Sequence, residues 1–199
     1  MGSDLRTAIK NRHSNYDITS ASPISDAEIQ ELVEFAVLHT PSAFNSQTAR
    51  VVLLLKDQHK KLWNIVKETL RKIVPEEDFP KTENKINSFA AGHGTVLFYE
   101  DRMQLDTMMK EFALYSEMIP GFSMNSAGML QYVVWTLLRD VGLGASLQHY
   151  GNLIEAEVAR TWNLPVGWKL IAQMPFGKAN SEPGNPEKKP IEEQFKLFA

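Results

Sequence analysis

The chain has 199 residues, of which 43% are hydrophobic and 23% charged, and 21 basic against 24 acidic residues give a formal charge of -3. This composition is ordinary for a globular protein and indicates one domain, and the lack of any block of like charge argues against nucleic-acid binding. No cysteine is present. Disulfides, thiolate metal sites and a cysteine nucleophile are therefore excluded, and any redox chemistry has to reside in a cofactor.

Two further observations bear on where the protein acts. No apolar run approaches the ~20 residues needed to cross a bilayer. The N-terminal segment also lacks the apolar core of a signal peptide. We therefore expect a cytoplasmic protein.

Helices dominate the predicted secondary structure. Apolar residues recur at helical spacing, in chain order, at about residues 25–39, 62–70, 83–91, 105–118, 126–140 and 153–162. Ser25 and Glu28 make a capping box for the first of these, Pro120-Gly121 is expected to end the fourth, and Gly142 follows the fifth as a left-handed cap. The fifth helix is apolar over most of its circumference, which fits burial between layers or between subunits.

Three apolar runs have the length of strands, and they lie at residues 50–55, 95–99 and 168–174. The first two are continuous and bounded by polar segments, which is typical of central strands buried on both faces. Prolines from residue 178 onward indicate an extended C-terminal arm. We expect a mixed α/β layer structure with one domain over residues 1–199, of which 178–199 form the arm.

Arg12-His13-Ser14 places a guanidinium, an imidazole and a hydroxyl on consecutive residues. A phosphate monoester is bound well by a bidentate arginine fork together with short hydroxyl or backbone donors. Such triplets also commonly lie on solvated surfaces, so this segment alone does not establish an anion site.

Pro41-Ser42-Ala43-Phe44-Asn45-Ser46-Gln47 connects the first long helix to the first strand. Asn45 and Gln47 each offer a hydrogen-bond donor and an acceptor, as a heterocycle with alternating carbonyl and N–H groups requires. A capped turn, in which Pro41, Ser42 and Asn45 serve the backbone, explains the same residues without any ligand.

The segment from Gly142 to Tyr150 combines glycines with a polar aromatic end but lacks the G-x-G-x-x-G dinucleotide pattern. A glycine-rich link to a short strand explains these glycines equally well. The remaining histidines are interpreted as structural: His59 lies in a polar stretch expected at the surface, His39 ends a helix, and His93 lies between glycines. No spacing typical of metal ligands and no Ser-His-Asp arrangement is found, which argues against metalloenzyme and hydrolase functions.

Taken together, Arg12-His13-Ser14, the segment from Pro41 to Gln47 and the segment from Gly142 to Tyr150 resemble the nitroreductase family in order and spacing. The likeness is to its small branch, typified by fungal and Gram-positive nitroreductase-like proteins, with which Phe89 to Phe98 and Phe112 to Tyr115 also agree. The resemblance covers nearly the whole chain. It implies an α+β fold with a central mixed, mainly antiparallel sheet flanked by helices on both faces, in an intertwined homodimer that holds FMN at the subunit interface.

The resemblance also implies which residues contact FMN. They are Arg12, His13, Ser14, Tyr16, Pro41, Ser42, Ala43, Asn45, Gln47, Lys85, Leu147, Gln148, His149, Tyr150, Lys188 and Lys189. The 41–47 segment would come from the partner subunit, and either Lys188 or Lys189 would meet the phosphate. The resemblance assigns no catalytic acid or base and no metal ligand, and Phe44, Phe112 and Tyr115 are expected to wall the substrate, although aromatics at such positions are more often plain core.

This sequence departs from the family pattern in two places. Many bacterial members carry a lysine near the pyrimidine edge of the flavin, where this chain has Tyr16, and a rough alignment makes Lys85 the substitute. A donor or cation is needed there because negative charge develops on flavin reduction. The usual Pro-Trp after the glutamine is replaced by Thr48-Ala49, so we expect a differently shaped substrate pocket.

The function implied is a ping-pong oxidoreductase that passes electrons from NADH or NADPH through FMN to nitroaromatics, quinones or similar small oxidants. A flavoprotein with a mainly regulatory or flavin-sequestering role is the alternative. An interaction protein without a cofactor is a third possibility, and it predicts a colourless preparation.

Overall fold

The computed structural model describes residues 4–181, 184 and 186–198, so residues 182, 183, 185 and 199 of the expected arm lie outside the described residues. The described helices are α1 (Leu5–Asn11), α2 (Asp26–His39), α3 (Lys56–Arg71), α4 (Phe79–Ala90), α5 (Arg102–Glu111), α6 (Ile119–Asp140), α7 (Gly151–Trp162) and α8 (Ile191–Gln194), with short 3-10 turns η1 (Ala43–Asn45) and η2 (Ala113–Tyr115). The described strands are β1 (Ile18–Thr19), β2 (Ala49–Leu55), β3 (Gly94–Asp101), β4 (Leu143–Ala145) and β5 (Trp168–Ala179).

The described strands form one antiparallel sheet in the order β1-β5-β3-β2, and β4 also pairs with β5. β3 is central and buried along nearly all of its length, as its apolar run predicts. β2 carries the same kind of pattern but is an edge strand with mostly half-buried side chains. The prediction that β2 is buried on both faces is therefore wrong for a single chain, because no other described strand pairs with its outer edge.

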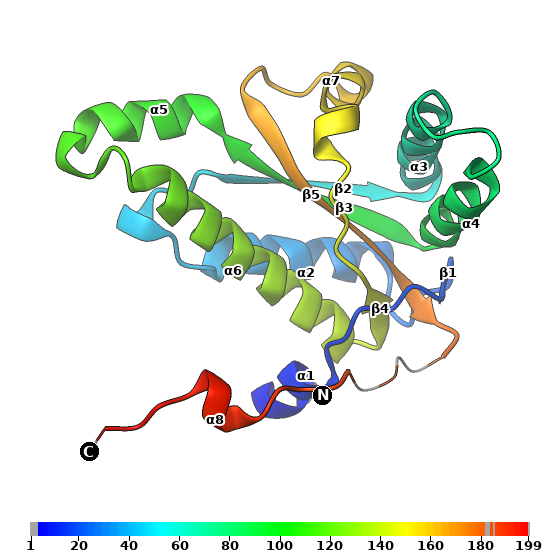
Figure 1. Cartoon of the computed structure of the whole chain (residues 1–199), viewed down its shortest axis with the longest axis horizontal. Helices are drawn as coiled ribbons and strands as arrows, with labels where there is room; N and C mark the ends of the chain where they lie inside the picture. The colour runs from blue at the N-terminus through cyan, green and yellow to red at the C-terminus, as the bar shows by residue number, and fades with distance from the viewer. Residues whose placement is uncertain (1–3, 182–183, 185, 199) are drawn as a thin grey trace.

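Helices cover both faces of this sheet (Figure 1). On one face α2 and α6 pack against alternate residues of β3, such as Val96 and Phe98. On the other face α3, α4 and α7 pack against Leu97 and Tyr99, which point the opposite way along the same strand. The expected α+β architecture, with a mainly antiparallel sheet between two helical layers, is confirmed.

Two prolines begin helices that the sequence pattern placed later. α6 starts at Ile119 with Pro120 in its first turn, whereas Pro120 was expected to end the preceding helix; that helix, α5, stops at Glu111. α4 likewise starts at Phe79 with Pro80 in its first turn, four residues before the expected start. Proline is tolerated in the first helical turn because the N–H groups there have no partner within the helix.

The capping predictions are confirmed. Ser25 and Glu28 form a reciprocal capping box at the start of α2, and Gly142 follows α6 with a φ of +86°, the left-handed conformation that favours glycine. β5 continues to Ala179, so the first two residues of the expected arm belong to the sheet. Beyond them the described part of the arm runs away from the sheet toward the C-terminus (Figure 1).

No described helix is both long and apolar enough to span a membrane.

Candidate active site

The first and third sequence segments lie side by side. Ser14 forms a parallel bridge with Ala145, and the Asn15 N–H donates to the Ala145 carbonyl at 2.9 Å. The indole N–H of Trp135 on α6 donates to the same carbonyl at 3.2 Å. Arg12-His13-Ser14 is therefore fixed beside the start of the 145–150 segment, against the C-terminal half of α6.

Arg12 lies flat over two aromatic rings at the end of α1. Its guanidinium carbon is 4.4 Å from the ring centroid of Trp135 and 5.8 Å from that of Tyr132. Its Nε is buried and has no hydrogen-bond partner among the described residues. A buried donor without an acceptor is costly, so this position suits an anionic ligand that accepts from the fork.

Residues 146–150 run alongside β5. Gln148 exchanges two backbone hydrogen bonds with Gln173, at 2.7 and 2.9 Å, and the side-chain carbonyl of Gln173 accepts from the Tyr150 N–H at 2.7 Å. Gln148 is buried and donates to the Ser146 hydroxyl, whereas Leu147 is half-buried and His149 is exposed. Burial raises the pKa of the Tyr150 phenol. The backbone of this segment is thus held rigidly, while alternate side chains face outward.

Tyr16 lies beside α4, the helix that carries Lys85. The Tyr16 ring is 6.3 Å from that of Phe89, and Lys85 lies one helical turn before Phe89 on the same side of the helix. Both Tyr16 and Lys85 are exposed. Tyr16 thus contacts the helix that carries Lys85, and the role of Lys85 as the substitute lysine stays a prediction.

The 41–47 segment is a strained loop. Phe44, Asn45 and Gln47 all have positive φ, at 55°, 52° and 48°, which non-glycine residues adopt only at a cost. The Ser42 hydroxyl accepts from the Gln47 N–H at 2.9 Å, as the capped-turn interpretation predicts for that residue. The Asn45 side chain makes no hydrogen bond within the described part of the chain, so it does not cap the turn.

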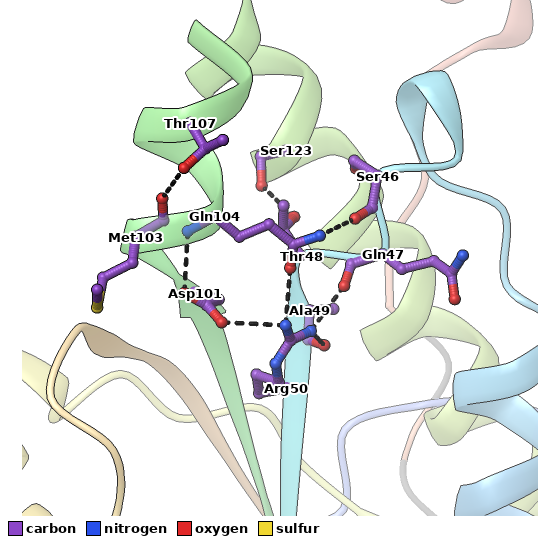
Figure 2. Close-up of polar contacts among 10 residues, drawn as sticks. All are labelled: Ser46, Gln47, Thr48, Ala49, Arg50, Asp101, Met103, Gln104, Thr107 and Ser123. Atoms are coloured by element: carbon purple, nitrogen blue, oxygen red, sulfur yellow. Dashed lines mark hydrogen bonds and ion pairs between the residues drawn. The ribbon is translucent and has the colours of Figure 1, made fainter. Parts of the chain in front are cut away.

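Neighbouring elements hold the loop in this strained shape (Figure 2). The Gln104 amide on α5 donates to the Ser46 carbonyl at 2.6 Å, and the Arg50 guanidinium donates to the Gln47 carbonyl at 2.6 Å. Arg50 also forms an ion pair with Asp101 at 3.0 Å. Because these contacts use the loop backbone, the side chains of Asn45 and Gln47 remain exposed.

The three aromatic residues expected to wall a substrate gather next to this loop. Phe44 stacks on Phe112 with ring centroids 4.8 Å apart and lies 5.8 Å from Tyr115. All three rings are between about one third and one half exposed. They form an open aromatic surface, not buried core.

Within one chain the Arg12 region and the loop lie at different ends of α6. The Ala43 N–H donates to the Ser126 hydroxyl, nine residues before Trp135, which is about 14 Å along the helix axis. The structure of one chain does not bring the 41–47 side chains to Arg12. Lys188 and Lys189 are exposed on the arm, whose first residues are tied to the Arg12 region by a hydrogen bond from the Asn15 amide to the Ser181 carbonyl.

Comparison with known proteins shows to which family a chain with this fold and these site residues belongs. The family model described as "Nitroreductase family" matches residues 9–178, which include the Arg12 region, the loop and the 145–150 segment. The chain belongs to the nitroreductase family. Members of this family are generally flavin-dependent oxidoreductases, and the fold and family make this chain an oxidoreductase.

Individual relatives agree with this assignment. The chain is 30% identical to the putative nitroreductase HBN1 of Saccharomyces cerevisiae over 86% of its own length and 83% of that protein, and 28% identical to the yeast nitroreductase FRM2 over 88% of each. The nitroreductase CinD from Lactococcus lactis, solved in complex with chloramphenicol, superposes with a TM-score of 0.89 at 34% identity over 98% of this chain and all of that one. The same protein has been solved with 4-nitrophenol.

Several residues that shape the site of this family member carry no recognisable sequence signal. Gln173 lies in the middle of an apolar strand, and its side-chain N–H group is buried without a partner among the described residues. Ser126 and Gln104 hold the 41–47 loop from helices that are distant in sequence. Such residues could be found only from the tertiary contacts, because each is one polar residue on an otherwise ordinary helix or strand.

His59 corrects a sequence prediction. It was expected at the surface but is 1% exposed, between α3 and the sheet. Its Nε2 faces the Ala90 carbonyl, which can only accept, so Nδ1 accepts from the Thr95 hydroxyl at 2.8 Å. Trp63 donates to the same hydroxyl. The polar residues around His59 in sequence cover the solvent face of α3, while His59 itself lies on its buried face.

This network predicts a pH-dependent stability. Burial lowers the pKa of His59 from 6.5 to about 4, so folding favours the neutral ring. The stabilisation is fully present above pH 6.5 and is lost as the pH falls from 6.5 to about 4, because the ring is protonated first in the unfolded chain; the loss totals about 3 kcal/mol of unfolding free energy. We expect thermal melts between pH 7 and 4 to show a steeper fall in Tm for the native chain than for His59→Gln. Equal slopes would contradict the neutral network.

Proposed function

We propose that this chain is an FMN-dependent oxidoreductase that passes electrons from NADH or NADPH to nitroaromatics, quinones or similar small oxidants by a ping-pong mechanism. The observation that carries the proposal is the half-buried Arg12, whose guanidinium lies over Trp135 with a buried, unpartnered Nε beside the 145–150 segment. A phosphate group supplies the acceptor that this donor lacks. His13 and Ser14 add donors on the adjacent residues.

Each group of site residues has a distinct role toward FMN in this proposal. When bound, FMN supplies the hydride acceptor for the nicotinamide and the electron donor for the oxidant. Arg12, with Lys188 or Lys189, neutralises the phosphate, and the fixed backbone of residues 147–150 lies against the ring. Lys85, near Tyr16, provides the cation that balances charge at the pyrimidine edge.

We further propose that the enzyme is a homodimer whose partner subunit completes each site. The separation of the 41–47 loop from Arg12 along α6 supports this, because one chain cannot present both to one flavin ring. The unpaired edge of β2 supports it as well: a groove of about 870 Å³ lies there, with Val37, Leu38 and Leu53 among its lining residues. The exposed Phe195, Leu197 and Phe198 of the partner's arm are suited to cover such a groove.

The oxidants are proposed to be flat aromatic molecules that lie against Phe44, Phe112 and Tyr115. Partly exposed rings offer stacking surface at little conformational cost. The complexes of CinD with chloramphenicol and 4-nitrophenol support nitroaromatics as a substrate class.

Steady-state kinetics test this proposal. NADH or NADPH oxidation is measured while the nicotinamide and a nitroaromatic or quinone are varied together. We expect saturable turnover and parallel double-reciprocal lines, since the nicotinamide leaves before the oxidant binds. A yellow protein that shows no saturable turnover would instead have the regulatory or flavin-sequestering role.

Asn45 and Ser42 give a matched pair of variants within one loop. We expect Asn45→Ala to weaken FMN binding or turnover, with a modest fall in the Tm of the apo-protein because alanine tolerates the φ of 52° less well than asparagine. Ser42→Ala should instead cost about 1 kcal/mol of stability, because it removes the acceptor for the Gln47 N–H. Apo-protein melts and FMN titrations of both variants decide this. A loss of stability in Asn45→Ala with unchanged FMN affinity would remove Asn45 from the site.

A further inference from the structure

A second pocket lies next to the proposed flavin site. It has a volume of about 690 Å³ and opens between α5, α6 and the ends of β3 and β5. Leu105, Met109, Met124 and Ile171 give it apolar walls, and His149 lines it from the segment expected to lie against the flavin. The pocket is large enough for a small aromatic molecule.

The backbone of the sheet is irregular at this pocket. Phe98 pairs with Ala172, but the next residue of β3, Tyr99, pairs with Leu170, so Ile171 is an extra residue in β5. Such bulges re-aim side chains and are common beside functional sites. Here the bulge turns Ile171 toward the α6 side of the sheet, the side to which Glu100 also belongs by its alternation with Tyr99.

Glu100 is the unusual residue of this pocket. It is 5% exposed, and its Oε1 is buried without a hydrogen-bond partner among the described residues. Its nearest cation is Arg102, whose Nε is 3.6 Å from Oε2, beyond hydrogen-bond distance. A buried carboxylate oxygen without a donor is costly, so Oε1 calls for a donor from outside the chain.

The surroundings of Glu100 define that donor. Arg102 and Lys169 balance Glu100 and Asp106 around the pocket, so it has no excess negative charge that would select a cation. A neutral O–H donor forms a charge-assisted hydrogen bond with the carboxylate. Nitro groups and quinones offer only acceptors, which cannot supply the donor that Glu100 Oε1 lacks, whereas hydroquinones offer hydroxyl donors on a ring that fits the apolar walls.

We propose that the Glu100 pocket binds small aromatic hydroxyl compounds of the hydroquinone class. Because these are the reduced counterparts of quinones, the pocket would hold product beside the flavin and favour it over unreacted oxidant. That role in turnover rests on the proposed oxidoreductase function, but the binding itself does not.

Anaerobic calorimetry on the full chain as purified tests the proposal, with hydroquinone and 1,4-dimethoxybenzene as probes. The two share a ring, but only hydroquinone donates hydrogen bonds. We expect hydroquinone to bind about tenfold or more tightly than the dimethoxy compound, as one charge-assisted hydrogen bond provides. Equal binding of the two compounds would overturn the proposal.

Matched variants locate the binding. Glu100→Gln keeps the shape but removes the charge and should abolish most of the preference for hydroquinone, while Asp106→Asn, which neutralises an exposed carboxylate on the same pocket, should preserve it. Gly128 also lines the pocket and has open space where a Cβ would lie, so Gly128→Leu should block binding without altering Glu100. An unchanged preference in Glu100→Gln, or in Gly128→Leu if the first variant does not fold, would overturn the proposal.

Flavin reduction by NADH or NADPH in the same preparations separates this proposal from the oxidoreductase function. Normal flavin reduction without a preference for hydroquinone would overturn only the proposal that the Glu100 pocket binds hydroquinones. A preference that depends on Glu100 in a chain that no nicotinamide reduces would support the pocket and contradict the wider function.

Discussion

Arg12→Ala is expected to raise the Kd for FMN by about 100-fold or more. The substitution removes a charged fork that would donate to the phosphate, and hydrogen bonds between charged groups contribute about 1.5–3 kcal/mol each. It also leaves Trp135 and Tyr132 without the cation that packs on them. Titration of the apo-protein with FMN, followed by fluorescence quenching, measures the effect.

Two controls define the cause of that loss. Arg12→Lys keeps the charge but not the fork, so we expect an intermediate affinity. Arg6→Ala removes an exposed arginine from α1, the helix that ends just before Arg12, and should leave FMN affinity unchanged. If Arg12→Ala purifies with full flavin occupancy, the phosphate does not lie at Arg12.

Removal of the apolar end of the arm is expected to dissociate the proposed dimer. Phe195, Leu197 and Phe198 are 61%, 75% and 92% exposed in a single chain. Burying each against a partner contributes roughly 1.5–3 kcal/mol. Replacing all three with serine should therefore weaken the dimer by more than about 1000-fold and release FMN, since the partner's loop would no longer be held at the site.

Sedimentation velocity with detection at the flavin wavelengths measures both effects in one experiment. Val166→Ser is the matched control, because Val166 is 92% exposed on the α7–β5 connection, away from the arm. It should leave the dimer intact. A triple variant that still sediments as a flavin-bound dimer would exclude the arm from the interface.

Local signals in the sequence predicted most of the fold. The capping box at Ser25, the left-handed cap at Gly142 and the buried run of β3 are set by neighbours in sequence, and all three are confirmed. The sequence pattern does not predict that α4 and α6 start with Pro80 and Pro120 in their first turns, because a proline can end one helix or begin the next equally well. Burial of β2 was misjudged because an apolar run does not reveal whether its strand lies at the centre or at the edge.

The candidate site was predictable only in its motif residues. Arg12, the 41–47 loop and the 147–150 segment form short local patterns that resemble a known family. Gln173, Glu100 and Ser126 carry no such pattern, because their roles depend on burial and on partners far away in sequence. His59 shows the same limit, since one buried side chain on an amphipathic helix is hidden among polar neighbours.

The visible absorption spectrum of the purified chain tests the central claim most directly. The account predicts flavin absorption in the native protein, bleaching on anaerobic addition of NADH or NADPH, and return of the colour when a quinone or nitroaromatic is added. A colourless protein that does not take up added FMN, or a yellow one that neither nicotinamide bleaches, would contradict it.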